Sequence, residues 1–402
     1  MRVLPAVLLA ALTASSAAAA APPRGCTMAH CDPQMSDAAR LPAPAAVREA
    51  WTDPAAASAA QGLGCSADGA LAACTFGDRT GDRSRPYLKV YDRDGTVRWT
   101  SRAELDSWAW TSVPLILPSG DLVAADDARL VRFAPGGRVR WRARTPGGAP
   151  ISPTRTADGT IVLATSGGPV SAYDPDSGRR LAALDLRGAE RGVEGRFDTR
   201  NTPGARGRRV YVSTAFTRDD GAMGDRARLY AIDVRPRARP GRRLTVAWHF
   251  DFGARSGASP LVVGDLVVFD GDRAVAGAPL APRFFAVRDR GDRPELVWEH
   301  LLGGPGVASA ALDPRGGAWV FTFGQPLLRR LSLTTGRVVQ EIDLDAAVGA
   351  AGTHVPLSAM TIAEGPGGGP AMLVTARAAE STHVVALDLV RGRPLWAHPL
   401  PA

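Results

Sequence analysis

The sequence predicts an all-β fold: a β-propeller of seven four-stranded antiparallel blades, with eight blades as the alternative count. Three observations support this. A pair of short strands around an Asp- and Gly-containing turn recurs along the chain and often ends in Trp, as in Leu88–Trp99 and Leu130–Trp141. A second pair of strands precedes each copy, with turns such as Ser119–Asp121. The entries to these units at Ser112 and Ser152 lie 40 residues apart, which is a blade length.

The repeats continue to the end of the chain. The later copies are Val170–Leu184, Leu229–Trp248, Phe284–Trp298, Leu328–Ile342 and Val384–Trp396. Residues 62–400 therefore divide into seven blades of about 48 residues. Six of the nine Trp residues stand at the repeat position, where we expect them to pack between neighbouring blades: Trp51, Trp99, Trp141, Trp248, Trp298 and Trp396. Val47–Trp51 matches an outer strand that could pair beside the last blade and close the ring, which is the basis of the eight-blade count.

The N-terminal residues predict export. Arg2 precedes the apolar run Val3–Leu12, and small residues follow up to Ala21. This is the pattern of a cleaved signal peptide over residues 1–21, and the apolar run is too short to span a membrane. No later segment reads as a transmembrane span. We therefore expect a mobile Pro/Ala-rich tail over residues 22–46, a single propeller domain over residues 47–402, and a secreted or cell-envelope location.

The cysteines fit an exported protein, in which disulfides form readily. There are four, Cys26, Cys31, Cys65 and Cys74. One solution pairs them locally, with Cys65 and Cys74 joined across a hairpin at Asp68-Gly69. The other links the tail to the first repeat. In either case we expect a structural role, away from the central site.

The net charge of +8 does not by itself predict an anionic partner, since Arg residues are scattered along the chain among Asp residues. We therefore predict no nucleic-acid binding. One stretch stands apart as a candidate anion-binding loop, with a solvated loop as the alternative: Arg235, Arg237, Arg239, Arg242 and Arg243.

Several copies carry a family resemblance. Leu229-Tyr-Ala-Ile-Asp233, Val384-Val-Ala-Leu-Asp388 and the ending Gly392-Arg-Pro-Leu-Trp396 resemble the repeat of PQQ-like, quinoprotein-type β-propellers. The resemblance covers nearly all of the mature chain. It implies the propeller fold, in a superfamily that includes dehydrogenases and non-catalytic envelope proteins. The dehydrogenases hold PQQ beside Ca²⁺, often against a vicinal disulfide, but this chain has no Cys-Cys pair and no C-x-x-C-H motif. We predict no cofactor.

No sequence signature of a common catalytic or nucleotide-binding site is present. Four acidic pairs beside Gly or Pro are assigned to turns, where Asp bonds the local backbone: Asp78 and Asp82, Asp92 and Asp94, Asp174 and Asp176, and Asp270 and Asp272. We predict no metal site, although Asp219, Asp220 and Asp225 remain the best metal candidates.

The loops that enter the innermost strands surround one mouth of a propeller channel and supply the candidate ligand or partner surface. That candidate set is Trp108, Trp110, Arg155, Arg200, Asn201 and His354. The alternative is that these residues cap strands and fill the mouth. The sequence thus predicts a monomeric, exported, non-catalytic binding or scaffold module for a protein, peptide or envelope component. The competing hypothesis is an enzyme that uses the central channel, either a degenerate quinoprotein oxidoreductase or a hydrolase or lyase.

Overall fold

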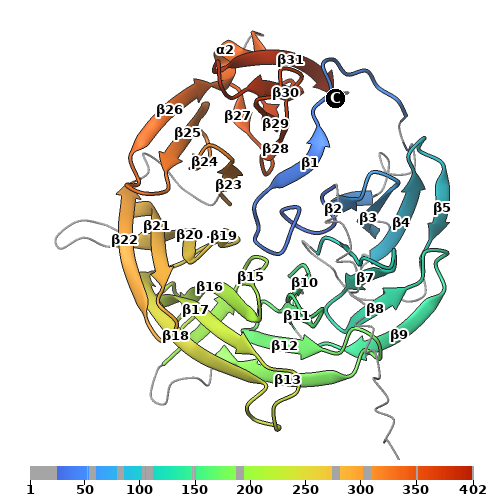
Figure 1. The fold of residues 1–402 in the computed structure, drawn as a ribbon, viewed down its shortest axis with the longest axis vertical. Helices are drawn as coiled ribbons and strands as arrows, with labels where there is room; N and C mark the ends of the chain where they lie inside the picture. The colour runs from blue at the N-terminus through green and yellow to red at the C-terminus, as the bar shows by residue number, and fades with distance from the viewer. Residues whose placement is uncertain are drawn as a thin grey trace, which may run out of the picture.

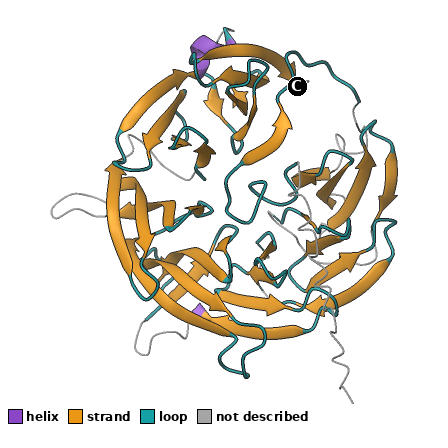
Figure 2. Ribbon diagram, viewed as in Figure 1, coloured by secondary structure: helices purple, strands orange, loops and turns teal. Residues whose placement is uncertain are grey.

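The computed structural model is a ring of seven blades around a central axis (Figures 1 and 2). It describes residues 25–51, 53, 60–78, 86–101, 105, 112–146, 148, 151–186, 194–273, 281–301, 309–349 and 352–400. These residues form seven sheets, and from β2 onward the chain passes through antiparallel strands from one sheet to the next in sequence order. The prediction of a seven-bladed all-β propeller is confirmed. No helix in the described ranges is both long and apolar enough to cross a membrane.

Five of the blades are regular four-stranded sheets whose innermost strand comes first in the sequence. Blade 1 contains β2 (Ala60–Ala67), β3 (Leu71–Asp78), β4 (Pro86–Asp92) and β5 (Val97–Thr100). Blade 2 contains β6 (Leu115–Ile116), β7 (Leu122–Ala125), β8 (Arg129–Phe133) and β9 (Val139–Arg144). Blade 3 contains β10 (Thr154–Arg155), β11 (Ile161–Ala164), β12 (Pro169–Tyr173) and β13 (Arg180–Asp185). Blade 5 contains β19 (Leu261–Val263), β20 (Leu266–Arg273), β21 (Ala281–Asp289) and β22 (Pro294–Leu301). Blade 6 contains β23 (Ala311–Asp313), β24 (Gly317–Phe321), β25 (Leu327–Ser332) and β26 (Val338–Asp343).

Blades 4 and 7 differ because their innermost strand is broken into two pieces that pair with the same second strand. Blade 4 contains β14 (Arg196–Thr199), β15 (Gly204–Arg206), β16 (Arg209–Thr217), β17 (Ala227–Val234) and β18 (Leu244–Gly253). Blade 7 follows the short helix α2 (Leu344–Val348) and contains β27 (Val355–Pro356), β28 (Thr361–Glu364), β29 (Pro370–Arg377), β30 (Thr382–Asp388) and β31 (Arg393–Leu400). The break in blade 4 falls at residues 200–203, where Pro203 has no backbone N–H to donate to a strand.

The antiparallel order gives the ring two different faces. Turns between the first and second strands and between the third and fourth strands lie on one side, here called the hairpin face. Turns between the second and third strands, and the connections between blades, lie on the opposite connection face. Of the described mouth residues predicted from the sequence, His354 precedes β27 on the connection face and Arg155 is the last residue of β10. The loop at residues 235–243 joins β17 to β18 on the hairpin face.

Tryptophans join neighbouring blades as predicted. The indole Nε1 of Trp99 donates a hydrogen bond to the Pro135 carbonyl at 2.8 Å, that of Trp141 to Pro175 at 2.9 Å, and that of Trp298 to Leu333 at 2.8 Å. Each acceptor lies in the third-to-fourth-strand turn of the next blade. The repeated Trp therefore closes the gap between one outer strand and the following blade.

Replacing Gly336 by alanine should destabilise the protein more than the same change at Gly316 in the same blade. Both glycines have positive φ, +68° and +85°, so each alanine meets a strain of about 1 kcal/mol. A Cβ at Gly336 would also lie 2.6 Å from the ring of Trp298, whereas nothing lies within 4 Å at Gly316. We expect an additional loss of about 2 kcal/mol at Gly336, measured by urea unfolding. Equal losses at both positions would contradict close packing of this Trp.

The ring closes differently from the sequence prediction. Residues 47–51 form no strand, so the expected outer strand Val47–Trp51 is wrong. Instead β1 (Ala38–Pro42) pairs in parallel with β28 on the inner side of blade 7. Trp51 still packs on blade 1, since its ring stacks on Tyr91 of β4 with centroids 5.1 Å apart. The eight-blade alternative is thereby replaced by seven sheets within the described ranges.

Candidate functional site

The central channel is occupied by the chain's own N-terminal segment, residues 25–37, here called the plug (Figure 1). Six plug carbonyls accept hydrogen bonds from the innermost strands of six blades. The pairs are Cys26 with Ala67 N (2.8 Å), Thr27 with Ile116 N (2.7 Å), Pro33 with Ala205 N (2.5 Å), Gln34 with Val262 N (2.8 Å), Ser36 with Leu312 N (2.8 Å) and Asp37 with Ile362 N (2.7 Å). The expectation of a mobile tail over residues 22–46 is therefore corrected for residues 25–42. The plug carbonyls satisfy N–H groups that the innermost strands would otherwise direct into the channel.

Two plug methionines fill the channel on the side of blades 2 and 3. Met28 and Met35 are 1% and 0% exposed and belong to one apolar cluster with Leu115, Leu163 and Tyr173. Unbranched, flexible Met side chains suit such an irregular space between several strands. The plug is thus anchored by apolar packing as well as by its carbonyls.

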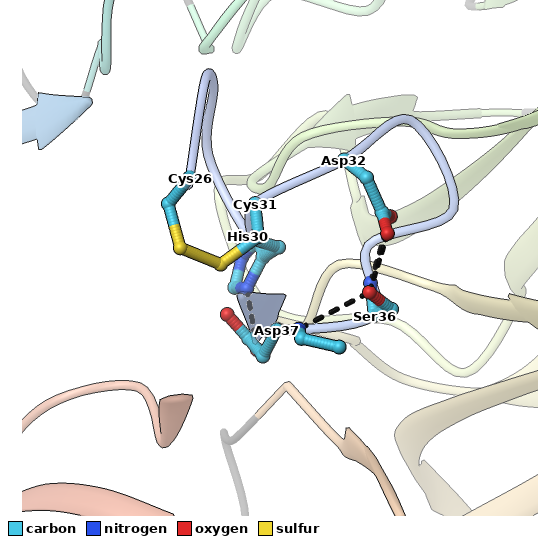
Figure 3. Close-up of a disulfide and its surroundings, with 7 residues drawn as sticks. Cys26, His30, Cys31, Asp32, Ser36 and Asp37 are labelled. Atoms are coloured by element: carbon cyan, nitrogen blue, oxygen red, sulfur yellow. Dashed lines mark hydrogen bonds and ion pairs between the residues drawn. A yellow bond between two sulfur atoms is a disulfide. The ribbon is translucent and has the colours of Figure 1, made fainter. Parts of the chain in front are cut away.

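The plug turns sharply, and a disulfide links the two ends of its first turn (Figure 3). Four non-glycine residues have positive φ: His30 at 56°, Cys31 at 69°, Met35 at 56° and Asp37 at 52°. The Cys26–Cys31 disulfide spans five positions, and Cys65–Cys74 joins β2 to β3. The local pairing is confirmed. The expectation that all cysteines lie away from the central site is wrong for Cys26 and Cys31, because their segment enters the channel.

A buried polar cluster holds the turn of the plug (Figure 3). The ring Nδ1 of His30 lies 2.9 Å from Asp37 Oδ2, its Nε2 lies 3.4 Å from Ser309 Oγ, and Ser36 Oγ donates to Asp32 at 2.5 Å. Burial alone would lower the pKa of His30, but the Asp37 carboxylate outweighs it and raises the pKa above its usual value. These groups bond one another and the blade wall, so their role is to hold the plug in the ring.

The sequence-predicted mouth residues are only partly brought together. Asn201 joins the plug site: its amide donates to the Gly257 carbonyl, its Oδ1 accepts from Ser259 Oγ at 2.8 Å, and its side chain is hydrogen-bonded to His30. Arg200 is exposed. Arg155, on β10, is half-buried with no hydrogen bond at Nε, and burial lowers its pKa. Trp108 and Trp110 lie outside the described residues.

His354 belongs to a separate cluster between α2 and the β29–β30 turn. It is fully buried, with Nδ1 3.4 Å from Asp345 Oδ1 and Nε2 3.4 Å from Ser381 Oγ. Its ring stands edge-on to His383, with centroids 5.3 Å apart. Burial and the neighbouring His354 lower the pKa of His383. His354 therefore has no contact with the plug or with Asn201 among the contacts of the described chain.

The hairpin face carries a hollow of about 430 Å³ between blades 4 and 5, here called the arginine hollow. Arg206 ends β15 and Arg208 lies in the β15–β16 turn, while Asp233 lies near the end of β17 and Arg235 directly after it. Asp289, at the end of β21, closes it from the side of blade 5. Three hairpin turns thus contribute charged side chains to one depression.

The floor of the arginine hollow is a fixed ion-pair network. Asp289 accepts from Arg209 at 2.8 Å, from the Tyr211 hydroxyl at 2.6 Å and from Trp248 Nε1 at 2.9 Å. Burial alone would raise the pKa of Asp289, but these hydrogen-bond donors outweigh it and lower the pKa. Burial and the neighbouring Asp289 carboxylate raise the pKa of Tyr211. Arg209 also bonds Asp233 at 2.7 Å. This floor is already neutralised, so any attraction for an anion comes from the arginines around it.

The predicted anion-binding loop divides into structural and exposed arginines. Arg243 donates to the carbonyls of Ala238 at 2.9 Å and Leu181 at 3.0 Å, which ties the loop to blade 3. Arg235 pairs with Asp233 at 2.7 Å. The other three loop arginines, all exposed, make no side-chain hydrogen bond or ion pair with described residues: Arg237, Arg239 and Arg242. The sequence interpretation missed Arg206 and Arg208, although the run Arg206-Gly207-Arg208-Arg209 was a visible signal.

The acidic pairs are partly as predicted. Asp94 and Asp174 bond backbone N–H groups of their own turns, and Asp220 likewise accepts from Ala222 N at 2.9 Å. Asp270 and Asp272 contradict the assignment to turns, because both lie within strand β20. Within the described ranges, no three His, Cys, Asp or Glu side chains gather as a metal site.

Comparisons with known proteins agree with the fold. A family model described as outer membrane protein assembly factor BamB matches residues 45–273, more than half of the chain. BamB from Moraxella catarrhalis superposes with a TM-score of 0.50 at 15% identity, covering 79% of this chain and 80% of that one. Quinohemoprotein alcohol dehydrogenase from Comamonas testosteroni gives 0.58 at 11%, covering 94% and 74%, and the computationally designed protein Ika8 gives 0.53 at 13%, covering 85% and 87%. No curated protein sequence matches. At these identities the structural likeness shows the fold alone.

Proposed function

Because the chain belongs to the PQQ-like propeller family described as outer membrane protein assembly factor BamB, we propose that it is an exported, non-catalytic propeller that binds a protein or peptide component of the cell envelope. The two local disulfides support an extracytoplasmic location, since such bonds persist in oxidising compartments. Residues 1–21, the proposed signal peptide, lie outside the described residues.

The observation that carries this proposal is the plug. An enzyme that used the channel would need room for its substrate beside the axis, but residues 25–37 bond six blades there. A quinone in the channel does not fit the same space, because Met28 and Met35 are buried in it. We therefore place the partner-binding surface on the loops of the outer faces of the ring, which the rigid blades hold in position.

Site-specific photo-crosslinking in the producing cell tests the proposal. A benzophenone amino acid is placed at exposed Arg237 on the hairpin face and, separately, at exposed Glu380 on the connection face. We expect the protein to be processed and exported, and at least one position to give an adduct with an exported protein, identified by mass spectrometry. Retention of unprocessed protein in the cytoplasm would contradict export. An absence of adducts, together with turnover of a small molecule by the purified protein, would favour the enzyme.

A further inference from the structure

We propose that the arginine hollow and its neighbouring loop form a docking site for an acidic segment of a partner polypeptide, one that carries at least two carboxylates. The inference rests on the proposed function, because it assumes a polypeptide partner, and it adds where that partner binds and by what chemistry. The site consists of Arg206 at the rim of the hollow and the exposed loop arginines Arg237, Arg239 and Arg242.

Around the hollow, most arginines have an acidic partner among the described residues, whereas these four do not. In blade 5, Arg288, Arg290 and Arg293 each lie within ion-pair distance of an Asp or Glu. Arg208 pairs with Asp158 at 2.9 Å, and Arg235 with Asp233 at 2.7 Å. Arg206 instead donates to the Gly264 carbonyl at 2.8 Å, and no carboxylate among the described residues approaches it. Around the hollow, the positive charge without an acidic neighbour in the described chain therefore lies on Arg206 and on Arg237, Arg239 and Arg242 of the loop.

The hollow supplies a rigid place for one side chain of the partner. Its floor is locked by Arg209, which bridges Asp233 and Asp289. A volume of about 430 Å³ admits an Asp or Glu side chain with part of its backbone. A carboxylate there would meet the guanidinium of Arg206, and a second carboxylate would meet the loop. Charge-assisted hydrogen bonds from Arg to carboxylate are among the stronger polar contacts available to such a site.

The arrangement favours a polypeptide over a nucleic acid. The carboxylates of Asp158, Asp233 and Asp289 lie among the arginines and already pair with Arg208 and Arg209, so a continuous row of phosphates laid across the face would not find a free cation opposite each phosphate. Separate carboxylates on a flexible segment can reach the arginines and avoid the acids. Complementarity of this kind sets specificity and association rate more than total affinity.

Fluorescence anisotropy with the full-length mature protein tests the site. The probes are a labelled twelve-residue peptide with alternating Glu and Ser, and the same peptide with Gln in place of Glu. We expect the Glu peptide alone to bind, with an affinity that falls as salt is raised. The triple variant Arg237→Gln, Arg239→Gln, Arg242→Gln should weaken binding about tenfold, and Arg206→Gln about fivefold.

A charge-matched control separates a local site from net charge. Arg138 and Arg337 are exposed in the third-to-fourth-strand turns of blades 2 and 6, and Arg393 is exposed at the start of β31 in blade 7. Their triple Gln variant should change the affinity less than twofold. All variants should keep the parent's unfolding midpoint, because the substituted side chains lie on the surface. An equal loss in both triple variants overturns the proposal, and so does equal binding of the Gln peptide.

A single-stranded oligonucleotide of equal charge tests whether the site prefers a nucleic acid to an acidic polypeptide. If it binds more tightly than the Glu peptide and loses that binding in the loop variant, the polypeptide assignment is overturned. If the Glu peptide fails to bind while position 380 crosslinks an envelope protein, the docking site is wrong and the proposed function stands. If neither position crosslinks and the Glu peptide also fails to bind, both are wrong.

Discussion

Replacing Met28 and Met35 together by alanine is expected to lower the free energy of unfolding by about 4–8 kcal/mol. Both side chains are essentially fully buried between the plug and the inner strands of blades 2 and 3. Each truncation removes apolar contacts and leaves a cavity that the surrounding strands cannot fill, because those strands are held by their own ladders. A loss of this size is a large share of the stability of a typical protein.

Urea unfolding followed by tryptophan fluorescence measures this loss. Gln34→Ala serves as the control, since Gln34 has an exposed side chain in the same segment and uses its backbone carbonyl to bond Val262. We expect the control to change stability by less than about 0.5 kcal/mol. If the double methionine variant unfolds like the control, the plug is not part of the folded ring, and the channel would again be available to a ligand.

The repeats could be predicted from the sequence because each blade carries its own local signals. The Asp and Gly of the turns, together with Trp at a fixed place, recur whatever the rest of the chain does, and the indoles of Trp99, Trp141 and Trp298 dock as expected. The plug could not be predicted in this way. Its contacts with six blades use backbone carbonyls, which every residue has, so a Pro/Ala-rich stretch gave no sign of them.

The candidate sites were harder to predict for a related reason. Arg237, Arg239 and Arg242 stand out because they are neighbours in sequence, whereas Arg206 lines the adjoining hollow from a position about thirty residues earlier. Asn201 and His354 occupy similar positions at strand entries, yet the first bonds the plug and the second lies against α2. The position of a residue in the repeat therefore does not predict its neighbours. The break in the inner strand of blade 4 brings Asn201 to the plug, and the helix α2 brings its own side chains to His354.

Replacing Asp270 by asparagine is expected to stabilise the protein at pH 8 by about 4 kcal/mol, and to change little at pH 4. Asp270 is 2% exposed in β20, and Oδ1 accepts from Ser256 Oγ at 2.7 Å and Ala258 N at 3.1 Å. Burial raises the pKa of Asp270 to about 7, and the nearby Asp272 adds to the rise. In the unfolded chain the same carboxyl titrates near its usual value of about 4.

The sign follows from which state holds the proton. Between about pH 4 and pH 7 the folded protein keeps the Asp270 proton and the unfolded chain has lost it, so unfolding becomes easier as the pH rises through that range. Asparagine stays neutral in both states and can still accept both hydrogen bonds, so the variant lacks this loss. His30 also has a raised pKa, and its contribution to stability likewise falls as the pH rises through that value, but it is present in both proteins and cancels in their difference.

Urea unfolding of the parent and of Asp270→Asn at pH 4, 5, 6, 7 and 8 measures the effect. We expect the two stability curves to meet at low pH and to separate progressively above about pH 5. Asp94→Asn is the control: the backbone N–H of Thr96 lowers the pKa of this exposed turn carboxyl, so its loss should give no gain at pH 8. Parallel curves for the parent and Asp270→Asn would show that the carboxyl is ionised in the folded protein throughout, and that Ser256 and Ala258 stabilise its charge more than burial opposes it.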